Sequence, residues 1–452
     1  MTECDVVVIG AGPAGEVCAG RLADGGLEVT LVEQELVGGE CAFYACMPSK
    51  ALLRPAQALA EVARVPGAHE AVTGWLDVGA VLARRDEVIH GLSDAGQLSW
   101  LEQRGITLVR GEARLQGERR VSVGAVTLAA RRAVVVAVGS TAAIPPVPGL
   151  AELSPWTNRA GTTAREVPGR LSVLGGGVVG CELAQAWATL GARVTLIEAG
   201  PRLLGREEPF AGEQVGDALR DRGVDVRLGV AVERAEGATT QRLILSGGEI
   251  VESERLLVAV GRRPRTSDLG LETVDLEPGA AIRVDDRMRV PGRDWLYAVG
   301  DVNERALLTH AGKYQARIAA DVILNRPARA ESDVPGPPRV VFTEPQVAAV
   351  GRTLDQALDA GIAARAVDAQ TESTAGASFV GRGAAGTARL VIDDQRGVIV
   401  GATFTGPEVA EWLHAATIAI VGEVPLGRLV HAIPAFPTRS EIWLKLLTDA
   451  TA

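Results

Sequence analysis

Residues 5–33 read DVVVIGAGPAGEVCAGRLADGGLEVTLVE, and residues 171–198 read LSVLGGGVVGCELAQAWATLGARVTLIE. Both stretches contain an apolar run, a glycine triplet, a segment compatible with a helix, a second apolar run and a closing glutamate. The first glycine precedes that glutamate by 23 residues in both copies, from residue 10 to 33 and from residue 175 to 198. The repeat predicts two strand–helix–strand units, each with a dinucleotide-binding loop.

The glycines of each triplet have separate physical tasks. They are Gly10, Gly12 and Gly15 in the first unit, and Gly175, Gly177 and Gly180 in the second. The first glycine permits a tight turn, the second lets the backbone approach a pyrophosphate, and the third lets the helix pack on the strand. The helix N-terminus attracts phosphates, and the closing Glu33 or Glu198 accepts hydrogen bonds from a ribose diol. Two such units predict two bound dinucleotides.

Outside the repeat, breaks and apolar runs indicate further domains. Ala133–Gly139 and Leu296–Gly300 have the composition of buried strands, and Pro145–Gly149 reads as a stiff linker. Further breaks lie near Pro264 and at 335–338. From residue 339 onward the chain has short strand-like runs at 340–343, 388–392 and 398–404 and helical stretches near 407–421 and 438–448. This pattern is typical of an α+β domain.

Composition excludes several classes of protein. The 452 residues are 47% hydrophobic and 23% charged, an ordinary globular balance. A net charge of -10 argues against nucleic acid as a partner. No apolar run reaches the ~18–20 residues of a membrane span, and the N-terminus lacks the basic and apolar regions of a signal peptide. We therefore expect a cytoplasmic protein that binds neither nucleic acid nor membrane.

Two of the five cysteines lie close together, in the sequence GGECAFYACMPSK at residues 38–50. We expect a helix to begin at Cys46, with the sulfur of Cys41 about one helical turn away and within bridging range. A helix N-terminus lowers the pKa of a thiol and so favours the reactive thiolate. A metal site is the alternative, but no further ligand lies nearby in sequence, so we expect no metal. The other cysteines, Cys4, Cys18 and Cys181, are expected to be inert.

The two dinucleotide loops, the cysteine motif of residues 38–50 and the sequence AVGD at 298–301 together resemble the class I pyridine nucleotide–disulfide oxidoreductases. This family includes dihydrolipoamide dehydrogenase, glutathione reductase and mercuric reductase. The resemblance covers nearly the whole chain and implies an α/β fold. Two Rossmann-like domains bind FAD and NAD(P), and a C-terminal α+β domain builds a homodimer. The implied bounds are 1–144 and 265–336 for the FAD domain, 145–264 for the NAD(P) domain and 337–452 for the dimerisation domain.

The resemblance also implies the residues around each cofactor. For FAD they are Gly10, Gly12, Gly15, Glu33, Gly39, Lys50, Ala113, Gly139, Asp301, Leu308, Thr309 and His310. For NAD(P) they are Gly175, Gly177, Gly180, Glu198 and Gly261. Within these sets, Asp301 should bond the ribityl chain, and Leu308–His310 should pass along the pyrimidine edge of the flavin. Lys50, one of only three lysines, should lie by flavin N5 in a pair with Glu182.

The resemblance assigns different tasks to the two cysteines. Cys46 should face the flavin as the charge-transfer thiolate, and Cys41 should exchange with the substrate. Hydride passes from the nicotinamide to the flavin, and two electrons then reduce the disulfide. Glu198 favours the free 2′-hydroxyl of NADH, whereas Arg202 and Arg206 can reverse this choice. We expect NADH, with NADPH as the alternative.

One family motif is broken. The disulfide reductases carry His-Pro-Thr-x-x-Glu near the C-terminus, where the histidine is the acid–base and the glutamate orients it. Here residues 436–441 read FPTRSE, so Glu441 is kept but Phe436 cannot carry a proton. His431 lies five residues earlier and substitutes only if the backbone bulges. Mercuric reductase also lacks the histidine but uses a C-terminal cysteine pair, and this chain ends in LLTDATA. A ketopropyl coenzyme M oxidoreductase carries the phenylalanine but replaces the glutamate.

Aromatic residues are another departure. Phe43 and Tyr44 lie within the cysteine loop, and with Phe436 of a partner subunit they are expected to form an apolar substrate pocket near Cys41. The alternative is that these rings only pack the loop.

The sequence predicts an oxidoreductase that takes electrons from NADH through FAD and the Cys41–Cys46 pair to a small, apolar disulfide or electrophile. One alternative is a diaphorase that reduces quinones or metal ions directly from the flavin. Another is a subunit that, like dihydrolipoamide dehydrogenase, docks on a larger complex.

Overall fold

The computed structural model describes residues 1–237, 239–333 and 336–451, so Pro335 of the predicted break lies outside the described residues. The chain divides into two compact units, each built from three separate stretches. The first unit comprises 1–48, 86–143 and 262–334, and the second comprises 49–85, 144–261 and 335–452. The first glycine triplet lies in the first unit and the second triplet in the second.

The first unit is built on a seven-stranded sheet in the order β3-β2-β1-β6-β5-β4, with β16 also paired to β6. Its strands are β1 (Thr2–Ile9), β2 (Val29–Glu33), β3 (Thr107–Arg110), β4 (Ala113–Leu115), β5 (Arg120–Val123), β6 (Val126–Val136) and β16 (Leu296–Ala298). The pairs among β1, β2, β3, β6 and β16 are parallel, whereas β4, β5 and β6 pair antiparallel. β7 (Ser140–Ala142) and β15 (Arg262–Pro264) form a separate two-stranded ribbon.

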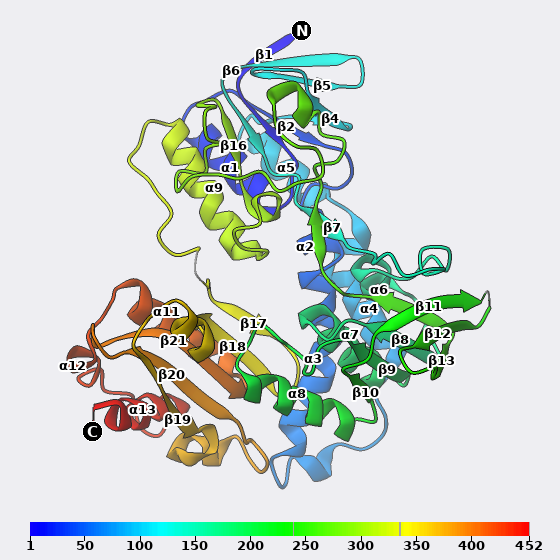
Figure 1. Cartoon of the computed structure of the whole chain (residues 1–452), viewed down its shortest axis with the longest axis vertical. Coiled ribbons are helices and arrows are strands. Elements are labelled where there is room, and N and C mark those ends of the chain that lie inside the picture. The colour runs from blue at the N-terminus through cyan, green and yellow to red at the C-terminus, as the bar shows by residue number, and fades with distance from the viewer. Residues whose placement is uncertain (238, 334–335, 452) are drawn as a thin grey trace. The chain divides into compact units, whose positions relative to one another are not determined.

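Helices cover this sheet, and Figure 1 shows α1 and α9 side by side. The helical segments of this unit are α1 (Pro13–Asp24), α2 (Gly39–Phe43), η2 (His90–Leu92), α5 (Ala95–Gln103), η3 (Leu271–Val274), η4 (Gly300–Asn303) and α9 (Thr309–Ile323). β1 is apolar throughout its C-terminal half because both its faces are buried: Val6 and Val8 pack with α1 and α9, and Val7 and Ile9 pack on the opposite face.

Within its described residues, the second unit contains three sheets. The parallel sheet has the order β10-β9-β8-β14, with β8 (Arg170–Leu174), β9 (Arg193–Glu198), β10 (Asp225–Leu228) and β14 (Arg255–Val258). An antiparallel sheet consists of β11 (Val232–Gly237), β12 (Gln241–Leu245) and β13 (Ile250–Ser253). The C-terminal antiparallel sheet has the order β17-β18-β21-β20-β19, with β17 (Arg339–Val341), β18 (Gln346–Gly351), β19 (Ala364–Gln370), β20 (Thr387–Asp393) and β21 (Val398–Gly406).

The second unit also contains helical segments. Between residues 46 and 221 they are α3 (Cys46–Ala63), η1 (His69–Ala71), α4 (Val78–Val88), α6 (Asn158–Thr163), α7 (Val178–Thr189) and α8 (Pro209–Asp221). Beyond residue 353 they are α10 (Leu354–Asp359), η5 (Thr371–Ser373), η6 (Ala375–Phe379), η7 (Val409–Trp412), α11 (Leu413–Val421), α12 (Leu426–Leu429), η8 (Arg439–Glu441) and α13 (Ile442–Thr451).

The predicted α/β class and the two strand–helix–strand units are confirmed. Three local predictions are corrected. The strand expected at 133–139 is the end of β6, which stops at Val136. The strand expected at 296–300 ends at Ala298 because Gly300 starts a turn of 3-10 helix with φ +78°. The run at 340–343 forms a strand only to Val341, since the chain turns through residues 342–345 into β18.

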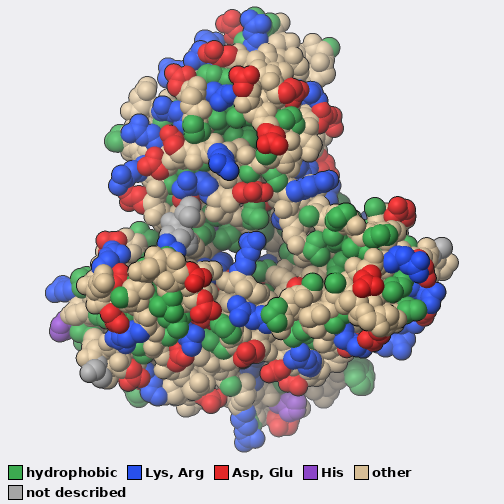
Figure 2. Space-filling model, in the orientation of Figure 1, with side chains coloured by type: hydrophobic (Ala, Val, Ile, Leu, Met, Phe, Trp, Pro, Cys, Tyr) green, Lys and Arg blue, Asp and Glu red, His purple; other side chains and the backbone are tan. Residues whose placement is uncertain are grey.

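On the face shown in Figure 2, basic and acidic side chains are interspersed, with no large field of one sign. Among the described residues, no helix combines the length and apolar character needed to span a membrane.

Candidate active site

The first glycine loop has the geometry of a phosphate cradle. Gly10 has φ +97°, and a Cβ there would lie 2.5 Å from the carbonyl oxygen of Ala137. A Cβ on Gly15 would lie 1.9 Å from the oxygen of Gly10, so α1 can approach β1 only because this residue is glycine. Gly12 is different, because a Cβ there would meet no atom within 4 Å. The open space above Gly12 is therefore where a pyrophosphate can reach the helix N-terminus.

The second loop repeats this geometry residue by residue. Gly175 has φ +110°, and its Cβ would lie 2.5 Å from the oxygen of Ala259. A Cβ on Gly180 would lie 1.8 Å from the oxygen of Gly175, whereas one on Gly177 would meet nothing within 4 Å. Because the two glycine loops share the same geometry, each unit has a loop suited to binding one dinucleotide.

The two closing glutamates also adopt one arrangement. Glu33 accepts hydrogen bonds from the backbone N–H groups of Ala11 (2.7 Å) and Glu35 (2.8 Å). Glu198 accepts them from Gly176 and Gly200, both at 2.6 Å. Each carboxylate is thus fixed beside its glycine loop, and an oxygen with two lone pairs can still accept from a ribose hydroxyl.

The cysteine loop lies in the first unit and consists of two helix ends. Cys41 is in α2, which ends at Phe43 with Tyr44 as its C-cap residue. The next helix, α3, begins at Cys46, as the sequence predicts. Gly39 lies against the first loop, because a Cβ on it would be 2.7 Å from the Cα of Gly12. The cysteine pair is therefore anchored directly to the dinucleotide cradle.

Both cysteines are thiols in this structure rather than a disulfide. The hydrogen bond between Cys41 and Cys46, together with burial and the charge of Cys46, raises the pKa of the Cys41 thiol above its usual value. Thr309 and Lys313 oppose this rise in the pKa of Cys41. The Cys41 thiol is therefore held in its protonated form beside the sulfur of Cys46.

Three predicted FAD residues stand at the start of α9. Leu308 is the N-cap residue, and Thr309 and His310 form the first turn. The Thr309 hydroxyl lies 3.5 Å from the sulfur of Cys46, within hydrogen-bonding range. This helix start therefore lies beside the cysteine pair, where the family resemblance puts the edge of the flavin.

The aromatic residues of the loop have different environments. Phe43 has no exposed surface and contacts Tyr44 edge to face, with ring centroids 6.4 Å apart. Phe43 therefore packs the loop, which corrects the expectation that it lines a substrate pocket. The Tyr44 hydroxyl is 3.3 Å from a carboxylate oxygen of Glu35 and donates to it.

Hydrogen bonds join a polar cluster that includes Ser140, directly after Gly139 in the sequence, and Glu40, directly before Cys41. Asp301 accepts a hydrogen bond of 2.5 Å from the hydroxyl of Ser140. The neighbouring Arg262 donates to Glu40 at 2.7 Å, and Arg265 donates to the second oxygen of Glu40 at 2.9 Å. Sequence reasoning missed Glu40, although an acid directly before a redox cysteine is a visible signal. The paired arginines neutralise this charge close to the position proposed for a pyrophosphate.

Two glycines and an alanine complete the set of residues that the sequence predicts to bind the two dinucleotides. Ala113 is the first residue of β4, Gly139 immediately precedes β7, and Gly261 immediately precedes β15.

In the second unit, Lys50 and Glu182 form the predicted ion pair, with Nζ and Oε2 2.7 Å apart. Glu182 is only 3% exposed and also accepts a hydrogen bond of 2.9 Å from the backbone N–H of Phe342. Lys50 lies 4.8 Å from the centre of the Phe342 ring. The ammonium group is therefore held from two sides, one turn of α3 after Cys46.

The C-terminal motif is also in the second unit. Glu441 accepts a hydrogen bond of 3.2 Å from the backbone N–H of Gly376. Phe436 is 77% exposed, and His431 lies on the surface of the turn that precedes it.

The remaining cysteines are buried. Burial raises the pKa of Cys18 to about 12 and also raises the pKa values of Cys4 and Cys181. No group of three or more metal-ligating side chains is assembled within residues 1–237, 239–333 and 336–451.

Comparison with known proteins agrees with this geometry. Residues 4–316 match the pyridine nucleotide-disulphide oxidoreductase family, and residues 337–447 match its dimerisation domain. The chain belongs to the pyridine nucleotide–disulfide oxidoreductase family. Its members are FAD-dependent oxidoreductases that bind NAD(P), and the loops described above fit both cofactors.

Several relatives and solved structures that resemble this chain match nearly its whole length. Dihydrolipoyl dehydrogenase of Chlamydia muridarum is 31% identical over 97% of this chain and 95% of its own length. Mercuric reductase of Acidithiobacillus ferrooxidans is 32% identical over 97% of this chain and 81% of its own length. The structure is similar to the Cu(II) complex of RclA, an HOCl-induced flavoprotein disulfide reductase of Escherichia coli, with a TM-score of 0.87, 25% identity and 99% coverage of both chains.

Proposed function

We propose that this chain is an NADH-dependent flavoenzyme that reduces a small disulfide through Cys41 and Cys46. The observation that carries the proposal is the contact between the two thiols, anchored to the first dinucleotide loop and beside Thr309. Bound FAD supplies the acceptor for a nicotinamide hydride and the two-electron donor to the cysteine pair.

The protein residues bind and orient around that chemistry. Gly12 and Glu33 hold the adenosine and pyrophosphate end of FAD, and Asp301 holds its ribityl chain. Lys50, fixed by Glu182, presents a positive charge toward flavin N5. The proposed domain bounds are 1–144 and 265–336 for FAD, 145–264 for NAD(P) and 337–452 for the homodimer interface. In that homodimer, Phe436 of the partner subunit faces Cys41.

The test of this proposal is a comparison of electron acceptors. The purified holoenzyme is given NADH and then a small disulfide, a quinone, Hg(II) or Cu(II). The proposal predicts that the disulfide supports turnover and that the reduced enzyme exposes two alkylatable thiols, at Cys41 and Cys46. Turnover with quinones or metal ions alone would favour a diaphorase or a metal-ion reductase, which the mercuric reductase relatives make the second candidate.

Replacing Gly177 with valine is predicted to weaken NADH binding by about 100-fold, which corresponds to ~2.7 kcal/mol. The variant should fold, since a Cβ at residue 177 meets no protein atom within 4 Å. The valine side chain fills the space through which a pyrophosphate approaches the N-terminus of α7. The measurement is the Kd for NADH, with bound FAD per chain as the control, and Gly12→Val should show the converse loss of FAD. An unchanged Kd would refute the assignment of this loop to the nicotinamide dinucleotide.

NADH should be preferred over NADPH by about tenfold or more in kcat/KM, or ~1.4 kcal/mol. Glu198 accepts hydrogen bonds from the backbone N–H groups of Gly176 and Gly200, and its negative charge should repel a 2′-phosphate. Arg202, one of the two arginines able to reverse the preference, donates to the carbonyl oxygens of Gly205 and Glu207 instead. Steady-state kinetics with both cofactors measures the ratio of kcat/KM for NADH to kcat/KM for NADPH. Glu198→Gln should lower this ratio. A native enzyme that prefers NADPH would contradict the prediction.

A further inference from the structure

The turn η4, which carries Asp301, is packed tightly against two helices of the first unit. A Cβ on Gly300, the first residue of η4, would lie 3.3 Å from the Cβ of Ala14 in α1. A Cβ on Gly312 of α9 would lie 3.2 Å from the Cα of Gly300. Because the turn touches α9 this closely, its position depends on the side chains that α9 presents to it.

The side chain of Gln315, on α9, holds this turn by hydrogen bonds. Its Oε1 accepts from the backbone N–H of Gly300 at 2.8 Å and from Nδ2 of Asn303, the last residue of η4, at 2.9 Å. The same Nδ2 also donates to the carbonyl oxygen of Ala298, the last residue of β16, at 3.1 Å. Gln315 has no exposed surface. One buried amide oxygen therefore ties both ends of the turn, on either side of Asp301, to α9.

Asp333 determines which way the Gln315 amide points. Its Oδ2 accepts from Nε2 of Gln315 at 3.0 Å and from Nε of Arg305 at 2.7 Å, and its Oδ1 accepts from Nη2 of Arg305 at 2.8 Å. Burial would raise the pKa of Asp333, but the hydrogen bonds from Arg305 and Gln315 lower this pKa below its ordinary value, so the group is a carboxylate at neutral pH. Since a carboxylate only accepts, Gln315 must present its NH₂ group to Asp333 and its oxygen to the turn.

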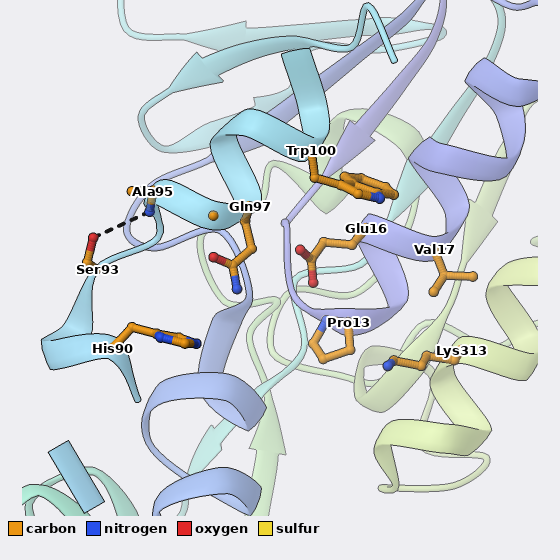
Figure 3. Close-up of a pocket in the computed structure, with 10 residues that line it drawn as sticks. Pro13, Glu16, Val17, His90, Ser93, Ala95, Gln97, Trp100 and Lys313 are labelled. Carbon is orange, nitrogen blue, oxygen red and sulfur yellow. Dashed lines mark hydrogen bonds between the residues drawn. The ribbon is translucent and has the colours of Figure 1, made fainter. Parts of the chain in front are cut away.

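This network is separate from the open cavity of the first unit. The cavity has a volume of about 730 Å³, and Glu16 from α1, Gln97 from α5 and Lys313 from α9 are among the residues that line it (Figure 3). Lys313 and Gln315 are two residues apart on α9 and therefore lie on different faces of this helix. Neither Gln315 nor Asp333 is among the described residues that line the cavity. The network thus acts on the turn and not on a molecule in the cavity.

We propose that Gln315 is a positioning residue of the flavin site: oriented by Asp333, it holds the turn so that Asp301 is presented to the ribityl chain of FAD. This inference rests on the proposed function, because the role of Asp301 toward FAD is taken from it. It assigns a task to two buried polar residues that contact neither a glycine loop nor the cysteine pair through the hydrogen bonds described above.

The test is the rate at which the holoenzyme releases FAD after dilution, followed by the recovery of flavin fluorescence. Gln315→Met keeps the length of the side chain but removes the acceptor for the Gly300 N–H. Release should become about 10- to 100-fold faster, because a buried donor loses its partner and the turn is no longer held. The Kd of the full-length, flavin-free chain for ADP should stay at the native value, because Gly12 and Glu33, rather than the turn, hold that half of FAD.

A double variant with the hydrogen bond reversed tests the role of Asp333. In Gln315→Glu/Asp333→Asn, the new amide donates to the new carboxylate, whose other oxygen still accepts from Gly300, and the total charge beside Arg305 is unchanged. This variant should release FAD more slowly than Gln315→Met. A release rate equal to that of Gln315→Met would show that Asp333 does not act by orienting this side chain, and the inference would fail.

Asp321→Asn is the matched control on the same helix. Asp321 accepts two hydrogen bonds from Arg21 of α1, at 2.9 and 2.7 Å, so this variant disrupts a similar arginine–carboxylate pair that does not involve the turn. Its FAD release should match that of the native chain, and equally fast release from Asp321→Asn and Gln315→Met would contradict the inference. If Gln315→Met releases FAD at the native rate, or weakens ADP binding as much as FAD binding, the inference fails while the proposed function stands. If the native chain binds no FAD, the proposed function itself fails.

Discussion

Replacing Cys41 with serine should lower NADH-dependent disulfide reduction on the order of 10³-fold or more, because a hydroxyl cannot act as the exchanging nucleophile. Cys41 contacts Cys46, which in turn lies 3.5 Å from Thr309, so no other described sulfur can take its place. Quinone reduction should persist, since the flavin still accepts hydride. The measurement is kcat/KM for both acceptors.

Cys4→Ser provides the matched control for this variant. Cys4 is buried, and its sulfur donates to the backbone oxygen of Val6, a bond that a serine hydroxyl can replace. Its activity should equal that of the native chain. Disulfide reduction that survives in Cys41→Ser would show that electrons leave the flavin by another route.

Replacing Phe436 with histidine should raise disulfide turnover by about 10²-fold, the lower end of what acid–base help contributes. The substitution should leave folding intact, because Phe436 is 77% exposed in the single chain. Glu441, held by the backbone of Gly376, is retained to orient an imidazole. Steady-state turnover of the variant and of the native chain measures the effect.

Phe436→Ala distinguishes a new base from a widened site. Alanine removes the ring without adding a proton carrier, so it should give no comparable gain. A histidine variant that is no faster than the alanine variant would rule out a missing base as the reason for slow exchange.

The fold was predictable because its determinants are local. The two glycine triplets, their apolar flanking runs and their closing glutamates place both dinucleotide units, and the second apolar run of the first repeat forms β2. The start of α3 at Cys46 and the pair between Lys50 and Glu182 also agree with prediction. These features were predictable because the apolar periodicity of the sequence is strong and because few other structural or chemical roles require the same residues at these spacings.

The rest of the site depends on contacts between segments far apart in sequence. Arg262 and Arg265 approach Glu40 only because β15 pairs with β7, which no local pattern shows. Phe43 looked like a pocket residue because an aromatic in a polar loop suggests a ligand, but the fold buries it completely. Burial, rather than residue type, decides between these roles.

Anaerobic titration of the purified holoenzyme with NADH tests the central claim most directly. If electrons pass through the flavin to Cys41 and Cys46, one equivalent of NADH should produce a long-wavelength absorbance band from a thiolate beside oxidised flavin, and Cys46→Ser should lack that band. Bleaching of the flavin by the first equivalent, with no such band and no new thiols, would show that the cysteine pair does not receive the electrons.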